Sequence, residues 1–241
     1  RRTASGLAMQ APASTVRRRA VALILLLLLS AAPLVPAAVG AAPRSTTVWS
    51  GTVVLQDGYT VESGDILVVQ SGTTIQLGDD ETILVAGRLT MQGTTTAPVL
   101  LESIAGNHDG IVFNSSSNGL GSKIENLTIT DAEYGVTVYD SNPTLNDLRV
   151  INADRVAVDL FDSASPRIND LVIDGGGQDV HGFSTSWRYG IGLSVGAYSA
   201  PIVDGMTADG LITRGLNYWG GSGGMLSNLE ISNVSGSSLA I

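Results

Sequence analysis

Residues 175–190 bring together side chains that are suited to binding a sugar. They include Asp179, His181, Trp187, Arg188 and Tyr189, with one of the two histidines and one of the three tryptophans of the chain. A flat aromatic ring stacks on the apolar face of a sugar ring, and polar groups bond the surrounding hydroxyls. Because binding residues concentrate in loops on rigid scaffolds, this stretch is a candidate carbohydrate site.

Three more aromatic residues in neighbouring segments, Tyr198, Tyr218 and Trp219, add to this candidate site. The alternative is structural, with the rings packing the 175–190 stretch against the rest of the protein. No metal centre is predicted, because His108 and His181 have no ligand partner at a useful spacing and the chain has no cysteine.

The elements that must position these residues are repeats. Five copies of a short pattern place an Asn, Asp or Gly immediately before a leucine or methionine. The markers are Leu127, Leu148, Leu171, Met206 and Leu229, separated by 21, 23, 35 and 23 residues. Pro143, Pro166 and Pro201 keep the same spacing. This period is typical of a solenoid with one copy per coil, and the long interval contains the 175–190 insertion.

A second segment of each coil alternates apolar residues with small or polar ones, at 135–138, 156–160, 190–193, 215–218 and 238–241. Alternation with a period of two predicts short strands. A coil of about 22 residues is too short for a helix plus a strand in most turns. Residues 46–241 are therefore expected to form one all-β solenoid domain, with the marker residues stacked inside it.

These repeats, with an opening block that reads VESGDILVV at 61–69 and ILVAGRLTMQGT at 83–94, resemble the pectin-lyase-like superfamily. The resemblance implies a right-handed, single-stranded parallel β-helix of the secreted microbial or archaeal type. That superfamily includes lyases, hydrolases and inert scaffolds, so fold alone does not give the activity.

Lyases of this fold combine Ca²⁺-binding aspartates with a basic residue, and the hydrolases pair carboxylates on adjacent coils. The candidates here are Asp159 with Asp162, Asp170 with Asp174, and Asp179 with His181, with Arg167 or Arg188 as the basic group. None matches a catalytic signature of the family, and aspartates at turns are explained by capping. No catalytic residue is assigned.

Residues 1–45 read as a signal peptide with its flanking residues. Three arginines, Arg17 to Arg19, precede an uncharged run at 20–42 that ends in small residues. A retained membrane anchor is the alternative, because the run is long enough to span a bilayer. Pro33 and Pro36 interrupt it and favour cleavage. We expect a secreted, extracellular or cell-surface protein without membrane insertion after cleavage.

Removal of the leader leaves 8 basic and 22 acidic residues, a net charge of −14. Such a domain repels nucleic acid and anionic membranes, so neither is an expected partner. The acidity is compatible with bound Ca²⁺, although solubility explains it and no cofactor is required. The lack of cysteine excludes disulfides.

Among the sequons, Asn114 lies in a polar loop and is the candidate glycosylation site, whereas Asn126 fits a turn of the stack. The sequence stops within a coil at Ile241, with no polar cap after it. It therefore predicts further coils or another domain beyond this residue.

Together these features predict an exported, non-catalytic β-helix scaffold that interacts with a polysaccharide or a surface glycan. The alternative is a polysaccharide lyase or glycoside hydrolase with its site near 175–190. A passive spacer is a third interpretation. Convergent carboxylates with a basic group in one groove favour an enzyme, whereas aromatic and scattered polar groups favour binding.

Overall fold

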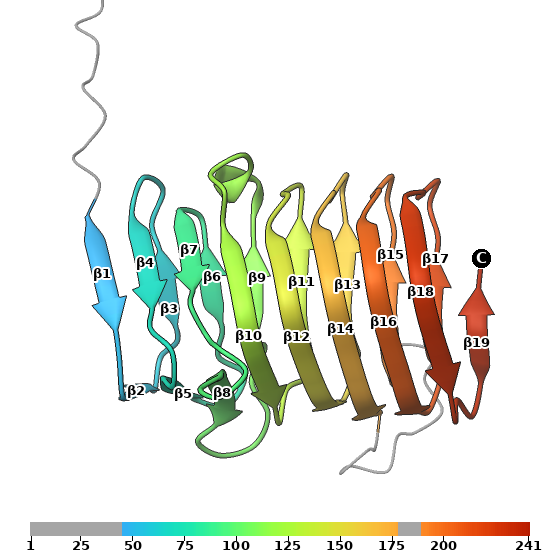
Figure 1. Cartoon of the computed structure of the whole chain (residues 1–241), viewed down its shortest axis with the longest axis horizontal. Helices are drawn as coiled ribbons and strands as arrows, with labels where there is room; N and C mark the ends of the chain where they lie inside the picture. The colour runs from blue at the N-terminus through green and yellow to red at the C-terminus, as the bar shows by residue number, and fades with distance from the viewer. Residues whose placement is uncertain (1–44, 178–188) are drawn as a thin grey trace, which may run out of the picture. The chain divides into compact units, whose positions relative to one another are not determined.

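The computed structural model describes residues 45–177 and 189–241 of the chain. Strands of successive coils pair in parallel, so the polypeptide winds as a β-solenoid with almost no helix (Figure 1). The expected all-β parallel β-helix is confirmed. The predicted signal peptide lies outside the described residues. Among the described residues, no helix is long and apolar enough to cross a membrane.

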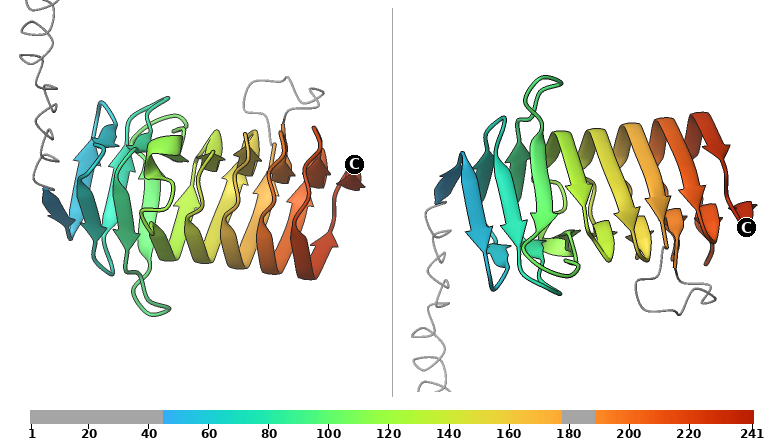
Figure 2. Two further views of the ribbon diagram at one scale, coloured as in Figure 1. Left: turned by 90° about the horizontal axis from the view of Figure 1, so that it is seen from above. Right: turned by 90° about the horizontal axis from the view of Figure 1, so that it is seen from below.

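Two sheets form the walls of the solenoid, and Figure 2 shows them from two sides. The eleven-stranded sheet consists of β1 (Thr46–Trp49), β2 (Thr52–Leu55), β4 (Ile66–Val69), β5 (Thr74–Leu77), β7 (Arg88–Met91), β8 (Val99–Ser103), β10 (Lys123–Thr130), β12 (Thr144–Ala153), β14 (Arg167–Gly176), β16 (Ile202–Leu211) and β18 (Met225–Ser232). The eight-stranded sheet consists of β3 (Tyr59–Val61), β6 (Ile83–Val85), β9 (Ile111–Phe113), β11 (Tyr134–Tyr139), β13 (Val156–Phe161), β15 (Ile191–Val195), β17 (Arg214–Tyr218) and β19 (Ser237–Ala240). A 3₁₀ turn, η1, covers Ser115–Ser117.

The marker residues form the predicted inward stack. In the register of β10, β12, β14, β16 and β18, each marker pairs with the marker of the next coil. Leu127, Leu148, Leu171 and Met206 are buried. Leu229 is 38% exposed because β18 is the last strand of its sheet. The interval of 35 residues pairs in the same register as the shorter ones, so the insertion leaves the stack intact.

The Asn or Asp before each marker bends the long strand. Asn126, Asp147, Asp170 and Asn228 all have positive φ, as does Gly205 at the same place in β16. Asn, Asp and Gly tolerate this left-handed conformation best, and the register skips over these residues as over a bulge.

Two of these side chains do not cap the local backbone, as aspartates and asparagines at turns are expected to do. The Asn126 amide donates to the carbonyl of Gly93 at 3.2 Å, and the Asn228 amide donates to the Asp204 carboxylate at 2.7 Å. Both bonds therefore join different coils.

The two walls are in close contact along a column of small residues in the eight-stranded sheet. A Cβ atom added to Gly135 would lie 2.9 Å from a Val150 methyl, and one added to Gly192 would lie 2.9 Å from a Leu211 methyl. Ala157 occupies the same place in β13 and is fully buried. Larger side chains there would push the walls apart.

We expect Leu171→Asp to unfold the solenoid or to destabilise it by several kcal/mol, because the charge would lie unpaired in the apolar stack. Val172 is the matched control. It follows Leu171 on β14 but points outward, between Arg149 and Thr207 of the neighbouring strands. Val172→Asp should leave the unfolding midpoint in urea nearly unchanged, and equal losses in the two variants would contradict the assigned register.

Candidate functional site

A groove runs along the solenoid axis on the outer face of the eight-stranded sheet. Its floor is a column of polar residues that the parallel register places one above another. The column consists of Thr137, Asp159, Ser194 and Asn217, on β11, β13, β15 and β17. Alternation along each strand turns these side chains outward while their neighbours Val158, Leu193 and Leu216 enter the core.

One rim of the groove is aromatic. Tyr139 pairs with Phe161 in the register, and their rings meet edge to face with centroids 5.2 Å apart. The next coil has Gly196 at the corresponding place, after Val195. The following coil has Trp219, whose side chain is 51% exposed. We call Tyr139, Phe161 and Trp219 the aromatic strip.

Trp219 reaches back over the coil before its own. A Cβ atom added to Gly196 would lie 2.0 Å from Cε2 of the Trp219 ring. The indole therefore lies directly against Gly196 and fills the place where that coil has no aromatic residue. Its Nε1 donates to the Ser194 hydroxyl at 3.5 Å, a long bond that orients the ring toward the groove floor.

The opposite rim consists of Tyr134, Val156, Ile191 and Arg214, which also pair in register. Arg214 donates from Nη1 to the Asn217 amide oxygen at 2.9 Å. Two cavities, of about 570 Å³ and about 240 Å³, lie between the rims and share Tyr134 and Asp159 in their walls. They are parts of one elongated groove.

Asp159 is the central charged group of the floor. Burial raises the pKa of its carboxyl group, while hydrogen bonds from the Ser194 hydroxyl and the Leu160 N–H oppose that rise. The carboxylate therefore keeps two donors that stabilise its ionised form. Ser194 itself is almost fully buried, so its hydroxyl is fixed between Asp159 and Trp219.

Asp109 lines the smaller of the two cavities, together with Asp159, Tyr134 and Phe161. Burial raises the pKa of Asp109, and the negative charges of Glu133 and Asp80 raise it further against the opposing charge of Arg155. Its Oδ1 atom is buried without a hydrogen-bond partner. A buried carboxyl oxygen of this kind favours the protonated acid or a ligand donor.

Arg155 connects the rim of the groove to Tyr189. Its guanidinium forms an ion pair with Glu133 and lies over the Tyr189 ring at 5.0 Å and the Tyr134 ring at 5.8 Å. The ion pair neutralises both charges locally. The cluster therefore holds Tyr134 at the rim through aromatic contacts with a cation.

His108 fixes the position of Asp109. Its Nδ1 atom accepts a hydrogen bond from the Gly110 N–H at 2.9 Å, so the proton of the neutral ring sits on Nε2, which donates to the Thr130 carbonyl at 3.0 Å. Burial lowers the pKa of His108, although the bond to Thr130 and the charge of Asp131 act in the opposite direction. Both ring nitrogens are used within the fold.

The structure brings only part of the sequence-predicted site together. Trp219 lines the groove, and Tyr189 contacts the arginine behind its rim. Tyr218 points into the coil, where it packs against the core. The other candidates, Asp179, His181, Trp187 and Arg188, lie outside the described residues, and their role in binding stays a prediction.

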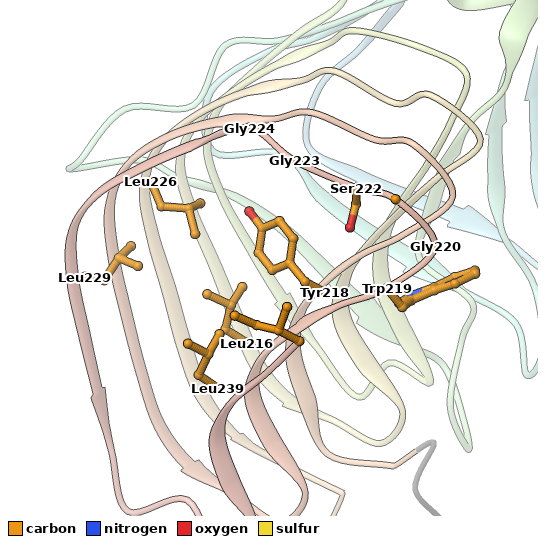
Figure 3. A pocket seen from close by; sticks show the side chains of 12 residues that line it. Leu216, Tyr218, Trp219, Gly220, Ser222, Gly223, Gly224, Leu226, Leu229 and Leu239 are labelled. Carbon is orange, nitrogen blue, oxygen red and sulfur yellow. The ribbon is translucent and has the colours of Figure 1, made fainter.

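A second hollow, of about 660 Å³, lies at the end of the last coil. Figure 3 shows Leu216, Leu226 and Leu239 pointing into it, whereas Trp219 points away to the outer face. These leucines continue the columns that form the core in earlier coils. The hollow is therefore the interior of the solenoid seen at its last coil, and we assign no ligand to it.

The carboxylate pairs suggested by spacing do not meet as pairs. Asp162 lies at a turn with positive φ and bonds the Tyr139 hydroxyl, away from Asp159 on the floor. Asp174 forms an ion pair with Arg149 at 2.7 Å on the outer face of the other sheet. Within residues 45–177 and 189–241, no group of three or more His, Cys, Asp or Glu side chains is arranged to hold a metal ion.

Asn114 caps η1, with its side-chain oxygen accepting from the Ser116 N–H at 3.0 Å. The amide nitrogens of the other two sequon asparagines are engaged, since Asn126 donates to Gly93 and Asn233 donates to Asp209. Glycosylation of Asn114 stays a prediction.

Most groove residues were not singled out in the sequence, among them Asp109 and Tyr134. Their signal was weak, because Asp109 belongs to a polar passage between repeats and Tyr134 starts a strand whose alternation explains it. Comparison with protein-family models, curated proteins and solved structures finds no match. What the groove does is therefore inferred from its own side chains.

We expect acid to destabilise the fold through His108. Because burial lowers the pKa of the folded histidine, the unfolded chain binds the extra proton first, so stability is complete above about pH 6.5 and falls as the pH drops toward the folded pKa. The free energy of unfolding falls by up to about 1.4 kcal/mol for each pH unit. His108→Asn keeps an acceptor for the Gly110 N–H and should reduce this fall in stability. Urea unfolding from pH 7 to pH 5 measures it. Parallel profiles for the two proteins would contradict the assignment.

Proposed function

We propose that the chain is an exported β-solenoid protein, of the pectin-lyase-like kind, that binds a neutral polysaccharide along the groove of its eight-stranded sheet. The aromatic strip beside a polar floor carries this proposal. Three rings follow the solenoid axis on one side, and the Thr137 hydroxyl and the Asn217 amide nitrogen offer uncharged polar groups beside them. This combination suits sugar rings, which have apolar faces and hydroxyl edges.

The groove is open and elongated, which suits a chain better than a compact small molecule. Its two cavities join end to end around Tyr134 and Asp159 and extend over several coils. A ligand that lies along the axis contacts one floor residue per coil, at a spacing of about 4.8 Å. Affinity then accumulates from repeated modest contacts.

Charge favours a neutral ligand. Asp109 and Asp159 lie in the groove, Arg155 is paired with Glu133, and Arg214 bonds Asn217 at one end. The carboxylates repel a chain of uronic acids or sulfated sugars in the half-buried floor, where screening by salt is weak. A neutral chain meets no such penalty and can donate its hydroxyl protons to the same carboxylates.

We expect Trp219→Ala to weaken binding of a neutral polysaccharide by about 1–3 kcal/mol, which corresponds to roughly 5- to 150-fold in Kd. The melting temperature should stay nearly constant, because the ring is half exposed and outside the core. Affinity electrophoresis against xylan, mannan and polygalacturonate measures both the loss and the preference for neutral chains. The control is Met225→Ala, which removes an exposed side chain from the other sheet.

A second variant moves the tryptophan without removing it. Gly196→Ala introduces a methyl group where the ring lies, and Gly196 has no positive φ, so the backbone tolerates alanine. Binding should fall and tryptophan fluorescence should shift. Gly223→Ala is the matched control, because its Cβ would meet nothing within 4 Å. Unchanged binding in both Trp219→Ala and Gly196→Ala would overturn the groove as the site.

Glycoside hydrolysis is the second candidate function, and the two carboxyl groups that line the smaller cavity favour it. Burial, and after it the negative charges of Glu133 and Asp80, raise the pKa of Asp109, so it holds a proton more readily, and its Oδ1 has no partner. Burial raises the pKa of Asp159 as well, but hydrogen bonds from the Ser194 hydroxyl and the Leu160 N–H stabilise its anion. Asp109 then protonates the glycosidic oxygen while Asp159 takes a proton from the water that attacks the anomeric carbon, and the C–O bond breaks.

If the groove hydrolyses a neutral glycan, both Asp109→Asn and Asp159→Asn should abolish the release of reducing ends, and Asp170→Asn should not. Asp170 is the control because it lies on the other sheet in a left-handed conformation that Asn also adopts. Activity should fall as the pH rises through the raised pKa of Asp109, since the general acid is then lost. Absence of reducing ends with intact binding would leave the non-catalytic proposal standing.

A further inference from the structure

The corner after β15 has an unfavourable backbone conformation for its residues. Ala197 and Tyr198 are consecutive and have φ values of 47° and 65°. The corresponding corner of the next coil has Gly220 and Gly221 with φ values of 66° and 75°. Glycine adopts this region without a steric penalty, whereas an aromatic residue does not. A tyrosine here reduces the stability of the fold.

Stacking of the coils imposes this conformation. The Ala197 carbonyl accepts from the Ser163 N–H at 2.9 Å, and the Tyr198 N–H donates to the Gly220 carbonyl at 3.2 Å. The corner is therefore bonded to the coil on each side. Residues in strained conformations that the surroundings enforce cluster at functional sites, which makes Tyr198 a candidate for one.

Packing does not explain the tyrosine. Its side chain is 75% exposed and belongs to no buried cluster. The ring only touches the surface above Gly221, where an added Cβ would lie 3.0 Å from Cε1. The Tyr198 ring is large, exposed and held in a conformation that glycine would adopt more easily. Contact with a molecule outside the fold explains such a residue.

The location indicates what that contact is. Gly196, the residue beneath the Trp219 indole, precedes Tyr198 by two positions, and the Tyr198 N–H bonds Gly220, the residue after Trp219. The two exposed rings therefore occupy the same corner of adjoining coils. Tyr198 therefore lies close to Trp219, the last residue of the aromatic strip.

We propose that Tyr198 is a second sugar-stacking residue, which extends the binding site around the corner to further units, or to a branch, of the neutral polysaccharide. This inference rests on the proposed function of the groove. Stacking uses the flat face of the ring, so the hydroxyl group is not needed.

The test compares Tyr198→Gly and Tyr198→Phe with the unchanged protein. Tyr198→Gly should raise the melting temperature by about 2–4 °C, because glycine relieves the left-handed strain. It should also weaken binding of long neutral oligosaccharides by roughly fivefold or more, as measured by titration calorimetry. Short oligosaccharides that fill only the groove should bind unchanged. Tyr198→Phe should keep the affinity for long chains.

A lower melting temperature in Tyr198→Gly would show that the ring is structural and would overturn the inference. Unchanged affinity for long chains in that variant, with a loss in Trp219→Ala, would also overturn it and leave the groove proposal intact. Unchanged affinity in both variants would remove both proposals.

Discussion

Parallel pairing of coil on coil, in register, is the constraint on which the structure depends. Because each outward residue sits above its counterpart in the previous coil, single side chains become columns. The groove floor is such a column, and the aromatic strip is another. No coil holds a complete site, since Asp159, Ser194 and Asn217 come from three coils. A shift of one residue in any strand would turn the floor inward and the core outward.

The same stacking explains where charge is tolerated. Aspartates on the eleven-stranded sheet receive bonds from the next coil, as Asp204 does from Asn228 and Asp209 from Asn233. Hydrogen bonds from Ser232 and Asn233 lower the pKa of Asp209. Asp109 has no partner for Oδ1, and its pKa is raised. Asp204 and Asp209 are thus satisfied on one face, whereas Asp109 is under-satisfied in the groove, which is where chemistry or binding is expected.

The sequence predicted the fold well, and it named only some of the residues that line the groove. The spacing of Leu127, Leu148, Leu171 and Met206 predicted the register, because apolar residues that recur once per coil are expected to stack on one another. Trp219 was recognised as a candidate, but its partner Gly196 was not. The signal was present, since Gly196 follows Val195 where Tyr139 and Phe161 follow Val138 and Leu160. Asp109 was missed because its burial depends on coils that are distant in sequence.

Because Trp219 reaches over Gly196, the two coils that carry these residues must stay adjacent when coils are gained or lost. Solenoids grow and shrink by whole coils, and most coils here could be duplicated with little harm because each contacts only its neighbours. An extra coil inserted between Gly196 and Trp219 would separate the ring from its glycine. The inserted coil would place its own residue under the indole. Any side chain larger than glycine at that place would displace the Trp219 ring. Lengthening of the array is therefore tolerated on either side of this pair but not within it.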